Sequence, residues 1–329
     1  MSRTVLVTGA TGLLGAALVR DFARKGWQVV AAARNVAKAE ELFAALENVR
    51  VAFWNVMEPA RAGLWDGAVD AIVHAASETS SPAFVERPVE TIGSILEGTR
   101  NVLEFARARQ VVAMVYLSTM EVYGAPSAAL VTEKDYGYLD PTAVRSSYPE
   151  AKRMAENLCV AYASEYGVPV KIARLTQTFG EGVHYEDGRV FAEFARAVIE
   201  RRDIVLKTEG TTARCYCYLG DAVAAIETIL EKGDVAKPYT VANEETYCTV
   251  REMAERVIAA NPSSGSRLVF DFADAGKRGF APPFQMRLDC SRLRALGWAP
   301  RTGLDEMFSR LIAHMRQSKA CRRQTFNGN

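Results

Sequence analysis

The sequence of 329 residues has almost no excess charge, no long apolar run and no repeated segment. Its 40 basic and 39 acidic side chains leave a formal net charge of +1, and the isoelectric point is near 7.6. Proteins dedicated to nucleic acids or acidic membranes usually carry a strong basic excess, so this balance argues against both partners. No apolar stretch is long enough to span a bilayer. We therefore expect neither a nucleic-acid partner nor a membrane partner.

Targeting and cysteine patterns are also lacking. The first residues, MSRTVLVTG, already have the pattern of a strand, which leaves no room for a signal peptide. The six cysteines follow neither a metal-ligand spacing nor a disulfide framework. Cys215 and Cys217 flank Tyr216 in a strand-like segment, where alternation favours packing over chelation. We expect reduced thiols, no metal site and a cytoplasmic protein.

Strand-like and helix-like segments alternate along most of the chain. The strand-like runs cover residues 5–8, 29–33, 51–54, 71–75, 112–117 and 170–174. This alternation predicts an α/β fold, a Rossmann-type doubly wound parallel sheet with a smaller C-terminal substrate-binding domain. We expect residues 1–175 to form the dinucleotide-binding domain, which the chain revisits near 210–235. The substrate-binding region would comprise 176–209 and 236–316, and residues 317–329 would form a flexible basic tail.

A glycine-rich turn follows the first strand and opens a helix. Glycines at this turn allow a tight bend and close approach of a pyrophosphate, while the start of the helix supplies free amides. The second strand, at 27–33, completes the arrangement that is typical of a dinucleotide site. The residues predicted to contact the cofactor here are Gly9, Thr11, Gly12, Leu13, Leu14 and Gly15.

The end of the second strand indicates which dinucleotide binds. Sites for NAD usually place Asp or Glu there, but this chain has Ala33 followed by Arg34. Arg34 would hold a 2′-phosphate and so favours NADP within an NAD(P) assignment; the alternative is an exposed arginine beside NAD. For His74 we prefer a structural to a catalytic role. Further cofactor contacts are expected from Asn55, Val56, His74, Ala75, Ala76 and Ser118.

Tyr148 and Lys152 lie four residues apart in a helix-like run, so both project from one helix face. A phenol ordinarily has a pKa near ~10, and the Lys152 ammonium together with an oxidised nicotinamide would favour the phenolate. Tyr148 would then take the proton of a secondary alcohol while Thr119 hydrogen-bonds the same oxygen. The two residues would also contact the cofactor. Alone, this spacing usually marks a solvated helix face, and the dinucleotide motif is what favours catalysis.

Together the glycine turn, His74-Ala75-Ala76, STMEVYG at 118–124 and SSYPEAK at 146–152 resemble the extended short-chain dehydrogenase/reductase family, which modifies nucleotide-activated sugars. The segments RSSYPEAKRMAENL and QTFGEGVHYEDGRV most resemble UDP-glucuronate decarboxylases, so a UDP-sugar is the favoured substrate. Those enzymes oxidise C4 of the sugar, lose the C6 carboxylate as carbon dioxide and reduce the ketone again.

This resemblance implies roles for particular residues. Thr119, Glu121, Tyr148 and Lys152 would be the catalytic set. Arg214 would reach the sugar diphosphate and take part in decarboxylation, Arg189 would lie near the nucleotide, and Gln177 would contact substrate where relatives have Asn. The resemblance also implies a homodimer formed through helices at 89–109 and 148–166, whose apolar faces are otherwise simply core.

The residues themselves are also suited to oxidation at C4 followed by loss of carbon dioxide. Once C4 is a ketone, a carboxylate on C5 is a β-keto acid, and it loses carbon dioxide to an enolate that cations stabilise. Glu121 follows Thr119 by two residues, so in an extended segment both face the substrate, where the carboxylate would move a proton. Met120 points the other way and cannot protonate a C6 hydroxyl, which disfavours 4,6-dehydration.

Several positions depart from the decarboxylase pattern. Ala33 replaces an acid, Gln177 an asparagine, and Glu181 and Gly182 replace proline and arginine. Gly182 removes a cation from the presumed anion path, and Glu181 is expected to repel an anionic ligand. The alternatives therefore remain a 4-epimerase, a 4,6-dehydratase, a 4-ketoreductase, or a cofactor-binding regulatory or scaffold protein without activity. Additional nucleotide contacts are expected from Leu206, Lys207 and the loop at 280–284.

Overall fold

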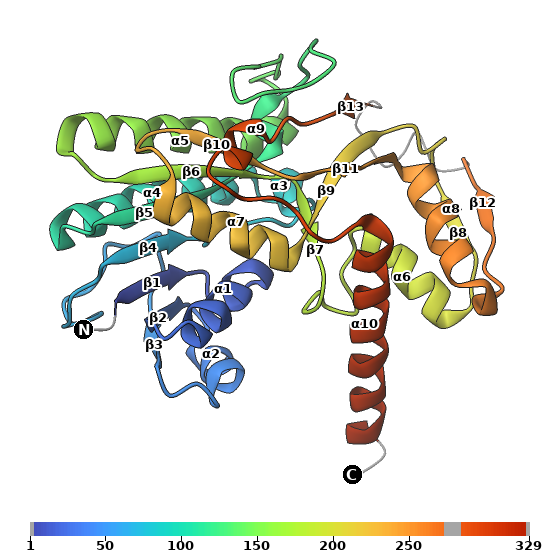
Figure 1. Ribbon diagram of the computed structural model, residues 1–329, viewed down its shortest axis with the longest axis horizontal. Coiled ribbons are helices and arrows are strands. Elements are labelled where there is room, and N and C mark those ends of the chain that lie inside the picture. Colours follow the sequence, from blue (N-terminus) through green and yellow to red (C-terminus); the bar gives the residue numbers. More distant parts are fainter. Residues whose placement is uncertain (1–2, 273–283, 327–329) are drawn as a thin grey trace.

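The computed structural model describes residues 3–272 and 284–326. Its centre is a seven-stranded sheet in the order β10-β6-β5-β4-β1-β2-β3, in which every neighbouring pair is parallel (Figure 1). These strands are β1 (Thr4–Thr8), β2 (Gln28–Ala33), β3 (Val49–Phe53), β4 (Ala71–His74), β5 (Ala113–Thr119), β6 (Val170–Leu175) and β10 (Pro238–Val241). The predicted Rossmann-type α/β fold is confirmed.

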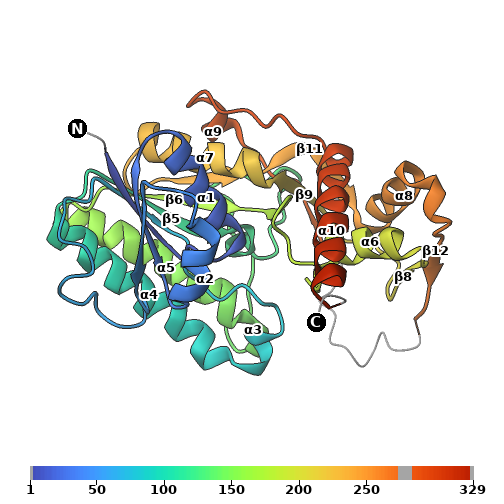
Figure 2. The ribbon, with the colours of Figure 1, turned by 90° about the horizontal axis from the view of Figure 1, so that it is seen from below.

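Helices cover both faces of this sheet, as the two views show (Figures 1 and 2). One face carries α1 (Leu13–Arg24), α2 (Val36–Phe43) and α7 (Leu219–Lys232); the other carries α3 (Ala83–Glu86), α4 (Pro88–Arg109) and α5 (Ser147–Tyr166). Strand residues alternate between the two cores, so a strand buried on both faces is apolar at nearly every position.

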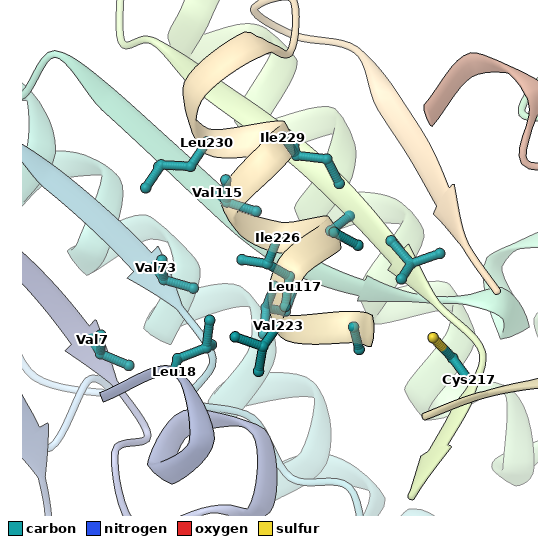
Figure 3. Close-up of a cluster of buried hydrophobic side chains, with 14 of the residues drawn as sticks. Val7, Leu18, Val73, Val115, Leu117, Cys217, Val223, Ile226, Ile229 and Leu230 are labelled. Atoms are coloured by element: carbon teal, nitrogen blue, oxygen red, sulfur yellow. The ribbon is translucent and has the colours of Figure 1, made fainter. Parts of the chain in front are cut away.

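The core beneath α7 illustrates this alternation. Val115 and Leu117 of β5 face α7, where Val223 and Ile226 lie over them (Figure 3). Tyr116, between them in sequence, faces the opposite core beneath α4 and α5. All these side chains are almost completely buried. Burial of such side chains contributes about 1.5–3 kcal/mol each, which holds β5 and its catalytic end in place.

A smaller region lies beyond the C-terminal ends of the main strands. One small sheet contains β7 (Gln177–Phe179), β9 (Ala213–Tyr218), β11 (Asn243–Thr249) and β13 (Gln285–Met286), and another pairs β8 (Ile204–Leu206) with β12 (Leu268–Phe270). Its helices are α6 (Val190–Glu200), α8 (Val250–Ala260) and α10 (Leu304–Phe326), whereas the short α9 (Ser291–Arg294) packs against β10 of the main sheet. A separate apolar core joins α6, α8 and α10 to the small sheet. Within the two described ranges no helix has a stretch apolar and long enough to cross a bilayer.

Three details differ from the predicted division of the chain. Strand β10 falls in the range assigned to the substrate-binding region, but it pairs with β6 in the main sheet. Strand β9 falls in the revisiting segment but belongs to the small sheet, and only α7 after it covers the main sheet. Helix α10 continues to Phe326, so most of the predicted tail is helical. Strand pairing between distant segments leaves no local periodicity, which is why the sequence did not show it. The domain boundaries themselves stay a prediction.

The order of the strands reverses between β1 and β4. Chain connections leave toward opposite sides at this point, which opens a crevice beyond the carboxyl ends of the strands, where α/β sheets bind their ligands. Thr8 and His74 are partners in the register across this boundary, and β5 and β6 follow in order. The ends of β1, β4, β5 and β6 therefore supply the site.

Candidate active site

The glycine turn after β1 is fixed by close contacts with the segment after β4. Gly9 has φ of +67°, and a Cβ atom there would lie 2.7 Å from the Ala76 amide nitrogen. At Gly15 a Cβ would lie 2.1 Å from the Gly9 carbonyl oxygen. Helix α1 begins at Leu13 without a side-chain cap and without an acid in its first turn. Its free amides and positive end therefore suit an anion such as a pyrophosphate.

Two residues predicted to contact the cofactor direct their side chains elsewhere. Leu13 packs against the core of the smaller region, and Leu14 packs against the core under α7. A Cβ at Gly182 would lie 3.2 Å from Leu13 Cδ1, so the loop after β7 rests on the start of α1. Only the backbone of these leucines is suited to a dinucleotide. Their side chains instead join the two regions at the turn.

The next strand end carries an exposed cation. Arg34 directly follows the buried Ala33, and its guanidinium has no hydrogen-bond or ion-pair partner among the residues that the structure describes. Asn35 caps α2 by accepting a hydrogen bond from the Lys38 amide at 3.0 Å. Asn55 lies beyond the end of the adjacent β3 and donates to Glu58 at 3.3 Å. The cation and an amide thus lie at neighbouring strand ends, with no acid at the end of β2.

Val56 belongs to the same strand end, but its main chain is already engaged. Its carbonyl oxygen accepts from Asn101 Nδ2 at 2.8 Å, which ties the segment after β3 to α4. A Cβ at Gly98 would lie 3.1 Å from Val56 Cγ2, so the valine side chain packs closely on α4. Val56 therefore positions Asn55 and offers a dinucleotide little beyond its own apolar surface.

His74 is a buried histidine held by two hydroxyl groups. Its Nδ1 lies 2.8 Å from Thr8 Oγ1 and its Nε2 lies 3.4 Å from Thr99 Oγ1. The Thr8 hydroxyl also accepts from the Ala76 amide at 3.2 Å. Burial, followed by the nearby charge of Lys152, lowers the pKa of His74 to about 3. A neutral imidazole with these partners ties β1, β4 and α4 together at the switch point, which is a structural role.

Lys152 is buried and anchored to the main chain of β5. Its Nζ donates to the Leu117 carbonyl oxygen at 2.8 Å, and burial lowers its pKa to about 8. Nζ also lies 5.9 Å from the centre of the Tyr148 ring. The lysine therefore joins α5 to β5 one turn along the helix from Tyr148, on the same face as the sequence predicts.

The environment of Tyr148 corrects part of the sequence-based expectation. Burial, followed by the charge of Glu121, raises the pKa of Tyr148 above its usual value. A hydrogen bond with Thr119 and the charge of Arg145 lower that pKa, but less than burial raises it. Loss of hydration opposes the phenolate, and helix spacing alone does not show burial. The phenolate thus depends on Thr119, on Arg145 and on any positive charge that a cofactor brings.

Thr119 and Glu121 lie at the end of β5, in the turn formed by η1 (Met120–Tyr123). The Thr119 hydroxyl accepts from the Glu121 amide at 3.2 Å, which fixes the turn. Met120 is 4% exposed and lies in the core, where its sulfur accepts from the Thr176 hydroxyl at 3.2 Å. Thr119 and Glu121 thus remain at the site while Met120 points away from it.

Two residues that the sequence analysis missed complete this cluster. Arg145, in η2 (Val144–Ser146), donates from Nη2 to both Glu121 oxygens, at 3.1 and 2.9 Å. Its guanidinium carbon lies 4.9 Å above the Phe84 ring, whose other neighbour is Tyr148, stacked at 4.1 Å between ring centres. Arg145 precedes Tyr148 by three residues, and that spacing was a usable signal. Nothing near Phe84 in the sequence marked it.

Ser118 was predicted to contact the cofactor, but its hydroxyl faces another way. Its Oγ donates to Glu156 at 2.5 Å, and Glu156 is paired with Arg174 at 2.7 Å in the interior. Because Ser118 and Thr119 are successive residues of a strand, their side chains point to opposite sides. The Ser118 side chain therefore belongs to a buried ion-pair cluster behind the site, and a contact of this residue with the cofactor stays a prediction.

The small sheet brings Gln177 and Arg214 close together. Gln177 is in register with Tyr216, and Arg214 precedes Tyr216 by two residues on the same face of β9. Gln177 Oε1, Arg214 Nε and the Tyr216 hydroxyl are buried and have no hydrogen-bond partner. The Arg214 guanidinium lies 4.8 Å above the Phe284 ring. Unpartnered buried polar atoms are costly, so this face suits a polar ligand.

Arg189 is engaged differently from Arg214. It forms an ion pair with Asp187 at 2.7 Å, and its guanidinium lies 4.8 Å above the Phe191 ring. Leu206 is buried in the core of the smaller region, and Lys207 pairs with Asp271. Of the loop predicted at 280–284, only Phe284 lies within the described residues. Within residues 3–272 and 284–326, no hydrogen bond, ion pair or ring contact joins Arg189 to Gln177 or Arg214.

The repulsion of an anionic ligand that the sequence predicts for Glu181 is offset by the partners of its carboxylate. Its carboxylate accepts from the Tyr218 hydroxyl at 2.7 Å and lies 3.6 Å from Arg310 on α10. Arg310 also donates to the Tyr218 hydroxyl at 3.1 Å. The charge of Glu181 is therefore balanced by a cation from a segment far along the chain, which the sequence pattern did not reveal.

Comparison with known proteins assigns the family. The model of the NAD dependent epimerase/dehydratase family matches residues 5–243. The chain belongs to that family. It is 31% identical over 308 residues to UDP-glucuronic acid decarboxylase 6 of Arabidopsis thaliana, covering 92% of this chain and 85% of that protein.

Other proteins extend the comparison. UDP-glucuronic acid decarboxylase 1 of Xenopus tropicalis is 28% identical over 323 residues, covering 96% of this chain and 72% of that protein. The structure of UDP-glucose 4-epimerase from Thermotoga maritima superposes with a TM-score of 0.82 at 19% identity, covering 96% of this chain and 99% of that chain. At that identity the superposition shows the shared fold. The resemblance indicated by the sequence motifs is confirmed.

The residues of this epimerase/dehydratase family member fit a nicotinamide dinucleotide. The unoccluded start of α1 lies beside Gly9, so its amides suit the pyrophosphate. Arg34 and Asn55 lie at the strand ends where the adenosine half would extend, and Tyr148 and Lys152 lie across the switch point from them. The Thr119 and Tyr148 hydroxyls would then lie on the side of the nicotinamide half.

Proposed function

We propose that the protein is a UDP-glucuronate decarboxylase-like enzyme that oxidises C4 of a nucleotide-activated sugar acid. The observation that carries the proposal is the grouping of Thr119, Tyr148 and the Glu121–Arg145 pair beside the dinucleotide turn. The relatives at 28 and 31% identity are UDP-glucuronic acid decarboxylases, which supports a uronic acid as substrate. Membership of the epimerase/dehydratase family supports redox chemistry at the sugar ring.

Oxidation of C4 would use Thr119, Tyr148 and Lys152. The Tyr148 phenolate would take the proton of the C4 hydroxyl, and the Thr119 hydroxyl would hold the same oxygen. Lys152 would keep α5 attached to β5 through the Leu117 carbonyl. A bound oxidised nicotinamide would supply the hydride acceptor and a positive charge that favours the phenolate. The burial of Tyr148 makes this added charge necessary.

Decarboxylation would follow from the chemistry of the C4 ketone. The C5 carboxylate is then a β-keto acid: its carbon–carbon bond to C5 breaks, carbon dioxide leaves, and the electron pair forms an enolate. Glu121, with Arg145 beside it, would reprotonate C5 when protonated itself. Arg214, whose Nε has no partner, would bind the diphosphate together with Gln177. Arg189 would lie near the nucleotide.

Met120 and Arg34 bear on the alternative reactions. The Met120 side chain is in the core, so it offers no acid for a leaving C6 hydroxyl, which disfavours 4,6-dehydration. Arg34 favours NADP through the 2′-phosphate. A net 4-ketoreductase, which would consume NADPH, is therefore the second candidate function. A 4-epimerase would need neither decarboxylation nor an NADP preference.

Helices α4 and α5 would form a homodimer interface. They pack side by side on one face of the sheet (Figure 2). Several of their exposed side chains are apolar. Val89 of α4 is 77% exposed and Met154 of α5 is 56% exposed. Helix α3, just before α4, adds Val85, which is 54% exposed. Burial of these apolar side chains would favour association, and sedimentation velocity at several concentrations tests it.

The proposed function is tested with UDP-glucuronate and the purified protein. Products are followed by mass spectrometry with NAD, with NADP and with neither. A UDP-pentose and one equivalent of carbon dioxide are expected from wild type. Tyr148→Phe should retain the cofactor and lose at least about 100-fold in turnover, because general acid–base groups contribute about 10²–10⁴-fold. A scaffold protein would show no turnover in either form. Unchanged UDP-glucuronate with bound cofactor would contradict the decarboxylase proposal.

A further inference from the structure

We propose that Arg145 is a positioning residue that holds the Glu121 carboxylate beside Thr119 and Tyr148 and offsets its negative charge there. The proposal rests on the proposed function, because it concerns the same site. Glu121 lies in the turn after β5, and Arg145 lies in the turn before α5, 24 residues along the chain. Only the folded structure brings the two together.

The geometry shows how Arg145 is itself held. Its Nη2 donates to both oxygens of Glu121, so the carboxylate has one fixed orientation. Its guanidinium plane lies over Phe84, and the Phe84 and Tyr148 rings are nearly parallel, with 9° between their planes. The Ser147 hydroxyl donates to the Phe84 carbonyl oxygen at 2.8 Å, which fixes Phe84 against α5. Phe84 therefore contacts both the Arg145 guanidinium and the Tyr148 ring.

The charges of Glu121 and Arg145 both act on the Tyr148 phenol. Glu121 and Arg145 act on the Tyr148 phenol with opposite signs, and their pairing leaves a nearly neutral unit beside it. Without the guanidinium, the Glu121 charge would face the phenol alone and oppose its ionisation. The other polar or charged groups that face Tyr148 are Thr119 and Tyr116 from β5 and Lys152 from α5. Among these groups and Arg145, the ion pair with the Glu121 carboxylate is made by Arg145.

A carboxylate needed for proton transfer at C5 gains from the same arrangement. A free Glu121 side chain would sample several rotamers, whereas the ion pair with Arg145 fixes one. The Arg145 side chain is 44% exposed, so the pair remains open to the crevice where a sugar would bind. Arg145 thus positions Glu121 without occupying the place of the substrate. This assigns Arg145 a role that acts through another residue.

The test measures ionisation of Tyr148 directly in the complex with oxidised cofactor. The phenolate absorbance is titrated in each protein and referenced to the same protein carrying Tyr148→Phe. Arg145→Gln should raise the pKa of Tyr148 by about one unit, and Glu121→Gln should lower it by a similar amount. The double variant should return close to wild type, and Arg145→Lys should restore most of the shift. This readout requires no turnover, so it is independent of the identity of the sugar.

Arg256→Gln is the matched control. Arg256 is also 44% exposed and pairs with Asp305 at 3.0 Å, but it joins α8 to α10 in the smaller region. It should leave the Tyr148 titration unchanged. With UDP-glucuronate, Arg145→Gln should lower kcat more than it changes KM. The pH profile of kcat should move upward by the same amount as the Tyr148 pKa in the titration.

Two results would overturn the proposal. One is a Tyr148 titration that responds equally to Arg145→Gln and Arg256→Gln while both variants keep the cofactor. The other is a Glu121→Gln variant in which the pKa of Tyr148 is not lower than in wild type, because removal of the anion must favour the phenolate. If the titrations shift as expected but UDP-glucuronate is unchanged, the positioning role stands and the decarboxylase proposal fails.

Discussion

The buried ion pair behind the active site gives the sharpest prediction about stability. Arg174 is 1% exposed, and it contacts the Glu156 carboxylate through Nε at 3.0 and 3.2 Å and through Nη2 at 2.7 Å. Its other hydrogen bonds to described residues go to the Glu133 carbonyl oxygen at 3.0 Å and the Tyr136 hydroxyl at 2.6 Å. Glu156 also accepts from Ser118. The substitution Glu156→Gln removes the charge with almost no change in volume.

The expected cost is set by the burial of the arginine. With glutamine at 156, the guanidinium stays in the interior without a counter-charge, and the amide nitrogen of glutamine faces a donor. Removing one partner of a buried pair costs about 3–5 kcal/mol, whereas an exposed pair is worth about 0–1 kcal/mol. Against a total unfolding free energy of about 5–15 kcal/mol, the loss would be a large fraction of the stability.

Guanidinium unfolding monitored by tryptophan fluorescence measures this cost by linear extrapolation. Asp305→Asn is the control, since the Arg256–Asp305 pair is exposed, with side-chain exposures of 44 and 64%. We expect a loss of about 3–5 kcal/mol for Glu156→Gln and less than about 1 kcal/mol for the control. Equal losses within about 1 kcal/mol for the two variants would refute the reasoning, because burial would then not decide the value of the pair.

Three further variants have defined outcomes. Gly15→Ala should lower the unfolding free energy by about 1–3 kcal/mol and weaken dinucleotide binding, because its Cβ would lie 2.1 Å from a backbone oxygen. Calorimetry and cofactor titration measure both effects. Gly188→Ala is the control, because a Cβ at residue 188 would lie in open space. Burial, followed by the neighbouring Asp21, raises the pKa of Glu227 from 4.5 to about 7, so its contribution to stability is complete below pH 4.5 and is lost as pH rises through 7. Glu227→Gln should therefore remove about 1–3 kcal/mol of the fall in stability between about pH 5 and 8, and an unchanged slope in urea unfolding would contradict this. Arg34→Ala should weaken NADP binding about 10–100-fold and leave NAD binding nearly unchanged, as measured by calorimetric titration; equal losses for both cofactors would argue against a 2′-phosphate contact.

The main sheet and the cofactor turn were predictable because their signals are local. Six strand-like runs correspond to β1 through β6, since strands buried on both faces are apolar at successive positions. Gly9 and Gly15 were recognisable because only glycine fits where a Cβ would meet backbone atoms. The Tyr148–Lys152 spacing follows from one helical turn. The pairing of β10 with β6 was not predictable in the same way, because it joins segments far apart in sequence.

Within the site, the sequence supplied the chemical groups but not all of their neighbours. Thr119, Glu121, Tyr148 and Lys152 were recognised from two short motifs. The direction of the Ser118 side chain was decided by the buried ion pair that accepts its hydroxyl. The balancing of Glu181 by Arg310 likewise depends on where α10 packs.

The sequence by itself determined the fold class, the dinucleotide turn and the identity of the reactive side chains, because each depends on residues within a few turns of one another. Tertiary structure alone decided the electrostatics of Tyr148. Its burial, the stacking of Phe84 against it and the pairing of Arg145 with Glu121 combine segments from α3, η1, η2 and α5. Charge interactions and desolvation depend on distance in space, and distance in space is set by the packing of the whole chain.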